Sequence, residues 1–369
     1  MRIVQLVYAL GQGGAERFVV NISNEMTKRG HEVTIVQILD DSDGNRSFNK
    51  QFLLPETNYI NLGFTSGFTF KKVKKVSDVI KQLNPDIVHC HLNVIPYIFP
   101  LAIRHRSIKF IHTLHNIAQK ASGIKIQKPI NNWFYKTGRI IPATISEECC
   151  ISFKQYYNTS KPVIKIDNGT VSVTPSPKFT IVQKELALIN PSQKPIFAHV
   201  ARFSEQKNQR LLIDAFNLLN KNGDEAILII IGDGFDSDEG KKLKNSACSA
   251  IHFLGLKANV GDYLLNSKYF ILSSNYEGLP ISLIEALSAG CTPVCTPVGG
   301  IPDVIKNGIT GYLSDNLSID NFVSTIRRAI AKPIDNEVVI NDFHKRFSIE
   351  QCVDKYLNVY NISIDRIRP

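Results

Sequence analysis

The 369-residue sequence lacks several features that would mark a special class of protein. No stretch approaches the ~18 consecutive apolar residues that a membrane-spanning helix requires. The sequence also contains no tandem repeat, no low-complexity segment and no recognisable nucleic-acid-binding module. With 43% hydrophobic and 21% charged residues, its composition is typical of a folded globular protein. A chain longer than the ~250 to 300 residues at which one core stops growing is expected to form two domains.

Metal-binding cysteine patterns are also lacking. The seven cysteines are odd in number and several lie in apolar runs, which favours buried, reduced thiols and a cytoplasmic location. Cys291 and Cys295 have no second Cys/His pair with zinc spacing after them, so we interpret them as core residues. Asp41-x-Asp43 lies in a polar turn, where solvent-facing turn residues are the better interpretation. The sequence therefore predicts no metal site.

The formal charge of +10 is unevenly distributed. Residues 1–172 contain 22 Lys+Arg against 12 Asp+Glu, whereas residues 173–369 contain 21 of each. This excess favours an anionic partner for the first half, either a membrane surface or a phosphate-bearing acceptor. The densest cluster is Lys71, Lys72, Lys74 and Lys75. A solvated helix face explains this cluster equally well on its own, but with the summed excess we expect peripheral contact with an anionic membrane through it.

Short apolar runs alternate with helical periodicity through the first half, which predicts a parallel sheet covered by helices. The run 2–10 passes into Gly11-Gln12-Gly13-Gly14 without a small-residue cleavage site, so we interpret it as a strand and not a signal-peptide core. A helix over 15–29 and a strand over 33–39 complete one βαβ unit. Further strands are predicted over 87–91, 109–115 and 140–145.

The amino-acid composition changes between residues 164 and 195, where a Pro/Ser/Thr-rich stretch indicates an interdomain connection. We therefore predict one domain over 1–172 and a second over 173–345, and we expect 346–369, with an amphipathic helix over 349–360, to pack back on the first. The second domain is predicted to contain strands over 196–201, 227–231, 251–254, 270–273 and 293–296, with helices over 209–220 and 281–289. In each sheet the carboxyl ends of the strands share one edge, where ligands bind.

Cations and glycines follow the predicted strands. Arg202 and Lys207 come between the strand 196–201 and the next helix, so both side chains can reach the ligand-binding edge, although two solvated loop cations remain the alternative. The glycines at 13–14 and 299–300 allow close approach of the backbone to a ligand, or only form tight turns. Cations and backbone N–H groups together suit a diphosphate leaving group.

Glu277 and Glu285 are separated by seven residues across a loop-to-helix junction. Helical rise over this spacing places them ~12 Å apart, beyond the ~5 to 9.5 Å that the carboxylates of a glycoside hydrolase require, so hydrolysis is disfavoured. Two structural alternatives remain open. Ser282-x-x-Glu285 also fits a helix capping box, and Glu277 also fits an exposed loop acid.

The segment 277–285 resembles the Glu-x7-Glu motif of the retaining GT-B glycosyltransferases of family four, also called group one. Several further motifs match in the family's order over most of the chain: Gly-Gly-Ala-Glu at 13–16, His-Thr-Leu-His-Asn at 112–116, Asn168-Gly169, 202–208, Gly232-Asp233-Gly234, 289–291, Pro293-Val294 and 299–302. The resemblance implies an α/β fold of two facing Rossmann-like domains with a deep cleft, the donor bound by the second domain and the acceptor by the first.

The resemblance also implies roles for individual residues. Glu285 is expected to hold the nucleotide ribose, and Glu277 the donor sugar near its anomeric carbon. Arg202 and Lys207 are expected to grip the diphosphate, and His115 to lie beside the transferred sugar. The other predicted donor-binding residues are Gly13, Gly14, Gly234, Leu256, Gly278, Leu279 and Gly300. The predicted acceptor-cleft residues are His89, His91 and Asn116, with simple packing as the alternative for the two histidines.

The function implied is metal-independent transfer of a hexosyl or related group from a UDP- or GDP-sugar to an acceptor hydroxyl, with retention of configuration. We expect a lipid-linked or saccharide acceptor, in cell-surface polysaccharide or glycolipid biosynthesis at the inner face of the cell membrane. A sugar-nucleotide epimerase of related fold and a catalytically silent nucleotide-binding protein are the alternatives. Only the transferase needs an acceptor to consume its donor.

Overall fold

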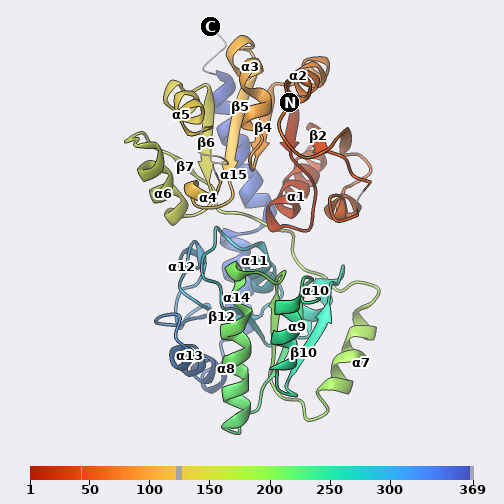
Figure 1. Cartoon of the computed structure of the whole chain (residues 1–369), viewed down its shortest axis with the longest axis vertical. Helices are drawn as coiled ribbons and strands as arrows, with labels where there is room; N and C mark the ends of the chain where they lie inside the picture. Colours follow the sequence, from red (N-terminus) through yellow and green to blue (C-terminus); the bar gives the residue numbers. More distant parts are fainter. Residues whose placement is uncertain (43, 122–126, 366–369) are drawn as a thin grey trace. The chain divides into compact units, whose positions relative to one another are not determined.

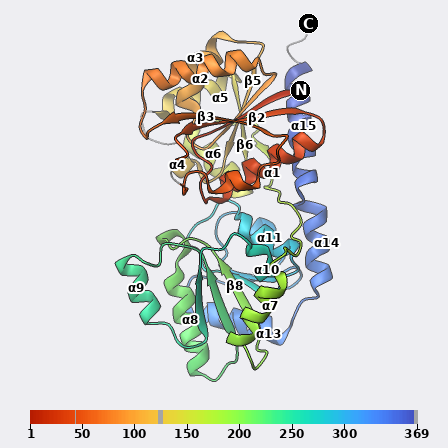
Figure 2. The ribbon, with the colours of Figure 1, turned by 90° about the vertical axis from the view of Figure 1, so that its right-hand side faces the viewer.

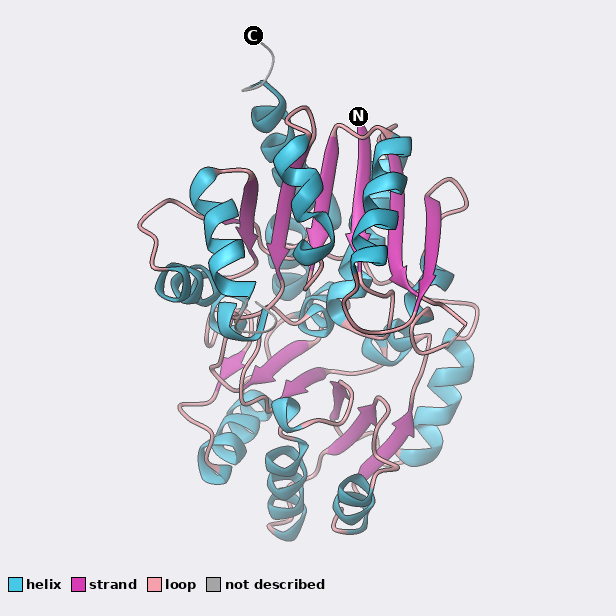
Figure 3. Cartoon of the chain, turned by 45° about the horizontal axis from the view of Figure 1, so that its top comes forward, coloured by secondary structure: helices cyan, strands magenta, loops and turns pink. Residues whose placement is uncertain are grey.

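The computed structural model describes residues 1–42, 44–121 and 127–365. Unit 1 comprises Met1–Thr170 and Phe347–Pro369, and unit 2 comprises Val171–Arg346. Each unit contains its own parallel sheet with helices packed on it (Figures 1 and 3). The predicted α/β class with two Rossmann-like domains is therefore confirmed, whereas the facing arrangement and the cleft stay predictions.

The sheet of unit 1 has seven strands in the order β3-β2-β1-β4-β5-β6-β7. The strands are β1 (Arg2–Val7), β2 (Glu32–Leu39), β3 (Asn58–Phe64), β4 (Ile87–His91), β5 (Lys109–Leu114), β6 (Ile140–Thr144) and β7 (Ile164–Lys165). The order reverses between β1 and β4, which are paired with Ile3 beside Ile87. Helices on opposite faces diverge at such a reversal, so it is where a ligand is expected to bind.

Two sets of helices cover the unit 1 sheet. Its helical elements are α1 (Gly14–Lys28), η1 (Phe48–Phe52), α2 (Phe70–Leu83), α3 (Ile95–Arg104), α4 (Ala118–Ala121), α5 (Lys128–Thr137), α6 (Glu147–Tyr157) and α15 (Ile349–Asp365). Val4 and Leu6 pack in one core with α2, α3, α5 and α6. Because side chains alternate along a strand, Val7 points to the opposite face and packs with Val19 of α1. On this face α15 contacts α1 and β5 (Figures 1 and 2).

The basic cluster on α2 is only partly exposed, which corrects one sequence expectation. Lys72 is 4% exposed, and its Nζ donates to the backbone carbonyls of Thr65 (2.6 Å) and Gly67 (2.5 Å). Its ammonium group satisfies the carbonyls of the preceding loop and is not available to a membrane. Lys71, Lys74 and Lys75 are exposed. None of the helices within residues 1–42, 44–121 and 127–365 combines the length and the hydrophobicity that a membrane-spanning segment requires.

The sheet of unit 2 has six strands in the order β10-β9-β8-β11-β12-β13. The strands are β8 (Ile196–Val200), β9 (Ile227–Ile231), β10 (Ile251–Gly255), β11 (Tyr269–Leu272), β12 (Thr292–Cys295) and β13 (Tyr312–Leu313). The helical elements are α7 (Phe179–Ile189), η3 (Glu205–Lys207), α8 (Gln209–Lys221), α9 (Asp238–Asn245), α10 (Val260–Leu265), α11 (Ile281–Ser288), α12 (Ile301–Val304), α13 (Ile319–Ala331) and α14 (Asn336–Arg346). The order reverses between β8 and β11, which are direct neighbours.

Candidate functional site

Two loops leave the carboxyl ends of β8 and β11, at the reversal point of the unit 2 sheet. The first loop carries Arg202 and Lys207, and the second carries Glu277. Hydrogen bonds join the loops directly, since Asn275 N–H donates to the Gln206 carbonyl at 2.8 Å and the Asn275 side chain donates to the Glu205 carbonyl at 2.8 Å. The strand order therefore brings together residues that are seventy positions apart.

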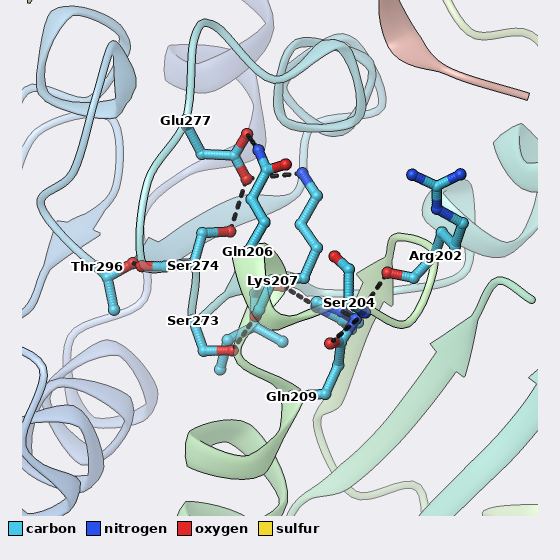
Figure 4. Close-up of polar contacts among 11 residues, drawn as sticks. Arg202, Ser204, Gln206, Lys207, Gln209, Ser273, Ser274, Glu277 and Thr296 are labelled. Atoms are coloured by element: carbon cyan, nitrogen blue, oxygen red, sulfur yellow. Dashed lines mark hydrogen bonds and ion pairs between the residues drawn. The ribbon is translucent and has the colours of Figure 1, made fainter. Parts of the chain in front are cut away.

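The carboxylate of Glu277 is the centre of this cluster (Figure 4). Its Oε1 accepts from Lys207 Nζ at 2.6 Å and from Ser274 Oγ at 2.6 Å, and its Oε2 accepts from Gln206 Nε2 at 3.2 Å. The Glu277 side chain is only 4% exposed, against 19% for Lys207. A carboxylate is tolerated at such burial because it is paired and hydrogen-bonded. Glu277 is therefore not an exposed loop acid, which removes that alternative.

The backbone beneath the ion pair is held by buried side chains. Ser273 Oγ donates to the carbonyls of Lys207 and Asn208, each at 3.0 Å. Thr296 Oγ1, from the loop after β12, donates to the Ser274 carbonyl at 2.8 Å. These hydrogen bonds hold the backbone from which the Lys207 side chain extends. Sequence reasoning missed Gln206, Ser273 and Ser274. The available signal was their position, since Gln206 lies in the polar loop after one predicted strand, and Ser273 and Ser274 lie at the end of another and directly after it.

Arg202 lies apart from the other labelled side chains in Figure 4. Arg202 is exposed, and within the described part of the chain its guanidinium has no hydrogen bond or ion pair. Its backbone carbonyl accepts from Gln209 Nε2 at 3.0 Å, which anchors the loop to the start of α8. A guanidinium presents five donors in a planar fork that suits phosphate oxygens. Arg202 can thus bind an anion without first breaking an ion pair.

Glu285 lies inside α11, one turn beyond its start. The helix is preceded by Pro280 as its N-cap residue, which makes no side-chain capping bond, and Ser282 is already the second helical residue. The capping-box interpretation of Ser282 and Glu285 is therefore wrong, because a capping serine stands at the N-cap. Glu285 is partly buried. Its predicted contact with a ribose stays a prediction.

The glycine turn at Gly299 and Gly300 packs against the Glu277 loop. Gly299 has a φ of +61°, and a Cβ added there would lie 2.1 Å from the Glu277 carbonyl oxygen. Gly300 is buried, and its N–H donates to the Gly278 carbonyl at 2.7 Å. The Gly300 N–H is therefore already hydrogen-bonded within the protein, and the predicted contact of Gly300 with the donor stays a prediction. The turn holds the Glu277 loop in place.

The other predicted donor-binding residues of unit 2 differ in exposure. Gly234, after β9, has a φ of +87° and is exposed, and Leu256, after β10, is 46% exposed. Both remain available to a ligand at the carboxyl edge of the sheet. Gly278 is buried and Leu279 is 4% exposed. Any contribution of the Leu279 side chain is therefore through packing of the loop.

In unit 1 the predicted residues lie on both sides of the β1/β4 reversal. Gly13 and Gly14 are exposed at the start of α1, where Gly13 is the N-cap residue without a side-chain cap. His115 and Asn116 follow β5 and are partly buried. The Asn116 side chain accepts from Ile117 N–H at 2.8 Å, which leaves its amide NH₂ for other contacts.

His89 and His91 do not line a cleft, which corrects the sequence expectation. Both are 0% exposed. His89 bonds through its two ring nitrogens to Tyr360 Oη and Thr113 Oγ1, each at 2.7 Å, and His91 contacts Gln5 and His115. Burial lowers the pKa of both imidazoles well below its ordinary value. They are neutral residues of the interior, as the packing alternative stated.

Two further expectations concern metals. Asp41 accepts from Lys50 Nζ at 2.9 Å and Tyr59 Oη at 3.0 Å, and the Lys50 hydrogen bond lowers the pKa of its carboxyl. Asp43 lies outside the described residues. No group of three or more His, Cys, Asp or Glu side chains in the described ranges could hold a metal ion.

Two family models match the chain, one in each unit. Residues 12–169 match "Glycosyltransferase Family 4", and residues 184–346 match "Glycosyl transferases group 1". Together they contain the candidate residues of both sheets.

Individual relatives agree with this assignment. The chain is 25% identical to an Escherichia coli UDP-Gal:alpha-D-GlcNAc-diphosphoundecaprenol alpha-1,3-galactosyltransferase over 81% of this chain and 78% of that protein. It is 25% identical to the Bacillus anthracis N-acetyl-alpha-D-glucosaminyl L-malate synthase over 94% and 93%. The fold is similar to that of a Rickettsia africae glycosyltransferase, with a TM-score of 0.82, 19% identity and 98% of each chain covered. The chain therefore belongs to the GT-B glycosyltransferases of family four, the group 1 glycosyltransferases.

Proposed function

We propose that this protein transfers a hexosyl or related group from a nucleoside diphosphate sugar to an acceptor hydroxyl with retention of configuration. The observation that carries the proposal is the Lys207–Glu277 pair, with Arg202 nearby in sequence, at the reversal point of the unit 2 sheet. A sugar nucleotide presents an anionic diphosphate next to neutral hydroxyls. Lys207 Nζ lies 2.6 Å from Oε1 of the buried Glu277 carboxylate. The ammonium group suits a phosphate, and the carboxylate beside it can accept hydrogen bonds from the sugar hydroxyls.

In the proposed reaction the acceptor oxygen bonds to the anomeric carbon on the face from which the diphosphate leaves. The bond between the anomeric carbon and the phosphate oxygen breaks, its electron pair stays on the phosphate, and that phosphate oxygen takes the acceptor proton. Arg202 and Lys207 stabilise the charge that develops on the leaving group. Glu277 orients the donor sugar and holds Lys207, while Glu285 holds the ribose. Gly13, Gly14, Gly234 and Leu256 border the donor.

Removal of the Lys207 charge tests the mechanism. We expect Lys207→Ala to lower turnover about ten- to a thousandfold, because a preorganised charge partner of the leaving phosphate is lost. Lys194→Ala is the matched control, since Lys194 is partly exposed and pairs with exposed Glu225 elsewhere in unit 2. Turnover by Lys207→Ala at the wild-type rate would rule out this role.

Donor identity is the first thing to measure. The name of the Escherichia coli relative includes UDP-Gal, so we propose a UDP-sugar, with GDP-sugars as the comparison set. A thermal-shift screen detects the donor because tight binding raises the apparent stability. Incubation of that donor alone separates the alternatives, since an epimerised sugar nucleotide indicates an epimerase. A donor that binds but is never consumed with any lipid-linked or saccharide acceptor indicates a silent binding protein.

The acceptor is proposed to be lipid-linked or a saccharide, in cell-surface polysaccharide or glycolipid synthesis at the inner membrane face. Support comes from α2, where exposed Lys71, Lys74 and Lys75 adjoin Phe68 and Phe70, which are 47% and 77% exposed. Cations attract anionic lipid headgroups, and aromatic rings favour the interface.

Co-sedimentation with anionic vesicles tests membrane contact. Binding at low salt should fall at high salt and on conversion of Lys71, Lys74 and Lys75 to glutamate. Conversion of Lys221, Lys241 and Lys242 to glutamate, at exposed positions of α8 and α9, controls for the same change in net charge. Equal loss of binding in the control would show general electrostatic attraction and contradict a role for the α2 surface.

A further inference from the structure

A chain of polar side chains crosses three adjacent strands of the unit 1 sheet and ends at His115. Gln5 lies on β1, His91 ends β4, and His115 follows β5. His91 Nε2 lies 2.8 Å from Gln5 Oε1, and His91 Nδ1 lies 3.1 Å from His115 Nε2. Gln5 and His91 are both 0% exposed. The three hydrogen-bonded side chains thus connect the interior of the sheet with its carboxyl edge.

The hydrogen-bond partners determine where the protons lie. Gln5 Nε2 faces Met26 Sδ at 3.7 Å, which leaves Gln5 Oε1 as the acceptor toward His91. His91 Nε2 must therefore carry a proton. Burial lowers the pKa of His91 well below its ordinary value, so the neutral ring has one N–H and its Nδ1 is an acceptor. The contact at 3.1 Å then requires the proton of His115 on Nε2.

The remaining nitrogen of His115 is an acceptor without a partner. Burial lowers the pKa of His115 to about 3, with a smaller contribution from His112, so the ring is neutral and its Nδ1 carries no proton. This Nδ1 atom is buried and has no hydrogen-bond partner among the described residues. Phe18 packs against the ring, with centroids 5.5 Å apart. Buried polar atoms are normally hydrogen-bonded, so an orphaned acceptor calls for a missing donor.

We propose that Gln5 and His91 are positioning residues that fix His115 as its Nε2–H tautomer, so that Nδ1 is held ready to accept a hydrogen bond from a substrate hydroxyl. The identity of the ligand as a sugar rests on the proposed function, but the tautomer does not. A histidine protonated on Nδ1 would present a donor instead. The site therefore selects a hydroxyl that donates, which a deoxy or fluoro sugar cannot supply at that position.

Nitrogen NMR of the histidine side chains in the free protein tests the tautomer without any substrate. At neutral pH, His115 Nδ1 is expected to be pyridine-like and Nε2 pyrrole-like, with signals identified by their loss in His115→Gln. Gln5→Leu should mix the tautomers, because it removes the acceptor that holds the proton on His91 Nε2. Gln37→Leu removes another fully buried amide of the same sheet and controls for destabilisation. A pyrrole-like Nδ1, or an unchanged tautomer in folded Gln5→Leu, overturns the proposal.

Binding measurements test the ligand. Gln5→Leu should weaken the binding of a UDP-sugar about two- to tenfold, the range that the net free energy of one hydrogen bond gives. The binding of UDP should be unaffected, because UDP carries no sugar to be transferred. Equal weakening of both ligands would show a general structural effect and overturn the assignment to the sugar. If the wild-type protein binds no sugar nucleotide at all, the proposed function fails, and the NMR result still decides the tautomer.

Discussion

The ion pair between Lys207 and Glu277 allows a quantitative test of how the unit 2 site is built. Removing one partner of a buried pair costs ~3 to 5 kcal/mol, because the other charge stays buried and uncompensated. Lys207 is 19% exposed, and Ser274 and Gln206 still donate to the carboxylate. We therefore expect the lower limit, about 3 kcal/mol, for Lys207→Met. In unit 2 this corresponds to a loss of about 6 to 12 °C in melting temperature.

Replacing the carboxylate should destabilise unit 2 less than replacing the lysine. Glu277→Gln removes the buried charge and leaves Lys207, whose ammonium group can reach water, so we expect a smaller loss of about 1 to 2 kcal/mol. The double variant should then be about as stable as Glu277→Gln alone. The coupling free energy from this cycle is then expected to equal the cost of Lys207→Met alone, about 3 kcal/mol.

The chain offers its own means of separating the two units. Trp133, the single tryptophan, lies on α5 of unit 1. Thermal unfolding followed by far-ultraviolet circular dichroism should show the lower melting temperature of unit 2 in Lys207→Met. Unfolding followed by Trp133 fluorescence should show no change, because Trp133 lies in unit 1. Lys194→Met is the control, because its partner Glu225, 3.3 Å away, is 71% exposed and such a pair near the surface contributes less than ~1 kcal/mol. If Lys207→Met is as stable as this control, or if the double variant loses the sum of both single effects, the reasoning is refuted.

Two further predictions concern unit 2. Burial lowers the pKa of His199 to about 4, so the unfolded state binds more protons between its ordinary pKa of ~6.5 and pH 4, and stability should fall by up to about 3 kcal/mol as pH drops through that window. Calorimetry at pH 7, 6 and 5 checks this; a melting temperature that rises on acidification contradicts it, and His199→Phe should flatten the dependence. Gly299→Ala should destabilise unit 2 by more than Gly308→Ala. Both positions have positive φ, but only at Gly299 would the added Cβ meet other backbone, 2.1 Å from the Glu277 carbonyl oxygen. Both substitutions place an alanine in left-handed backbone, which costs ~1 to 2 kcal/mol. Equal losses in the free energy of unfolding by urea would therefore contradict a clash between the added Cβ and the Glu277 carbonyl.

The regular elements were largely predictable because their signals are local. The strands predicted over 87–91 and 227–231 are confirmed as β4 and β9 with the same bounds. β3 was missed because its sequence, NYINLGF, mixes polar and apolar residues and is not fully buried at the sheet edge. The two-residue strands β7 and β13 are too short for any periodicity.

The candidate site was predictable only in part. Motif order was enough to select Arg202, Lys207 and Glu277, but periodicity cannot say which face of a buried strand a polar residue occupies or what covers it. His89 illustrates this, because its partner Tyr360 is 271 positions away and comes from α15. Lys72 is likewise indistinguishable in sequence from its exposed neighbours until the preceding loop folds over it.

The alternating α/β pattern, a chain long enough for two domains and the resemblance to the family could all be predicted from the sequence, since they depend on hydrophobic spacing and on motifs within short segments. Three facts became evident only in the folded protein: which of the chosen residues touch, that the Gly300 N–H donates within the protein, and that Gln5, His91 and His115 lie in hydrogen-bond contact. The cause is strand order. Parallel pairing places β8 beside β11 and β1 beside β4, and contacts between residues so far apart along the chain leave no local trace in the sequence.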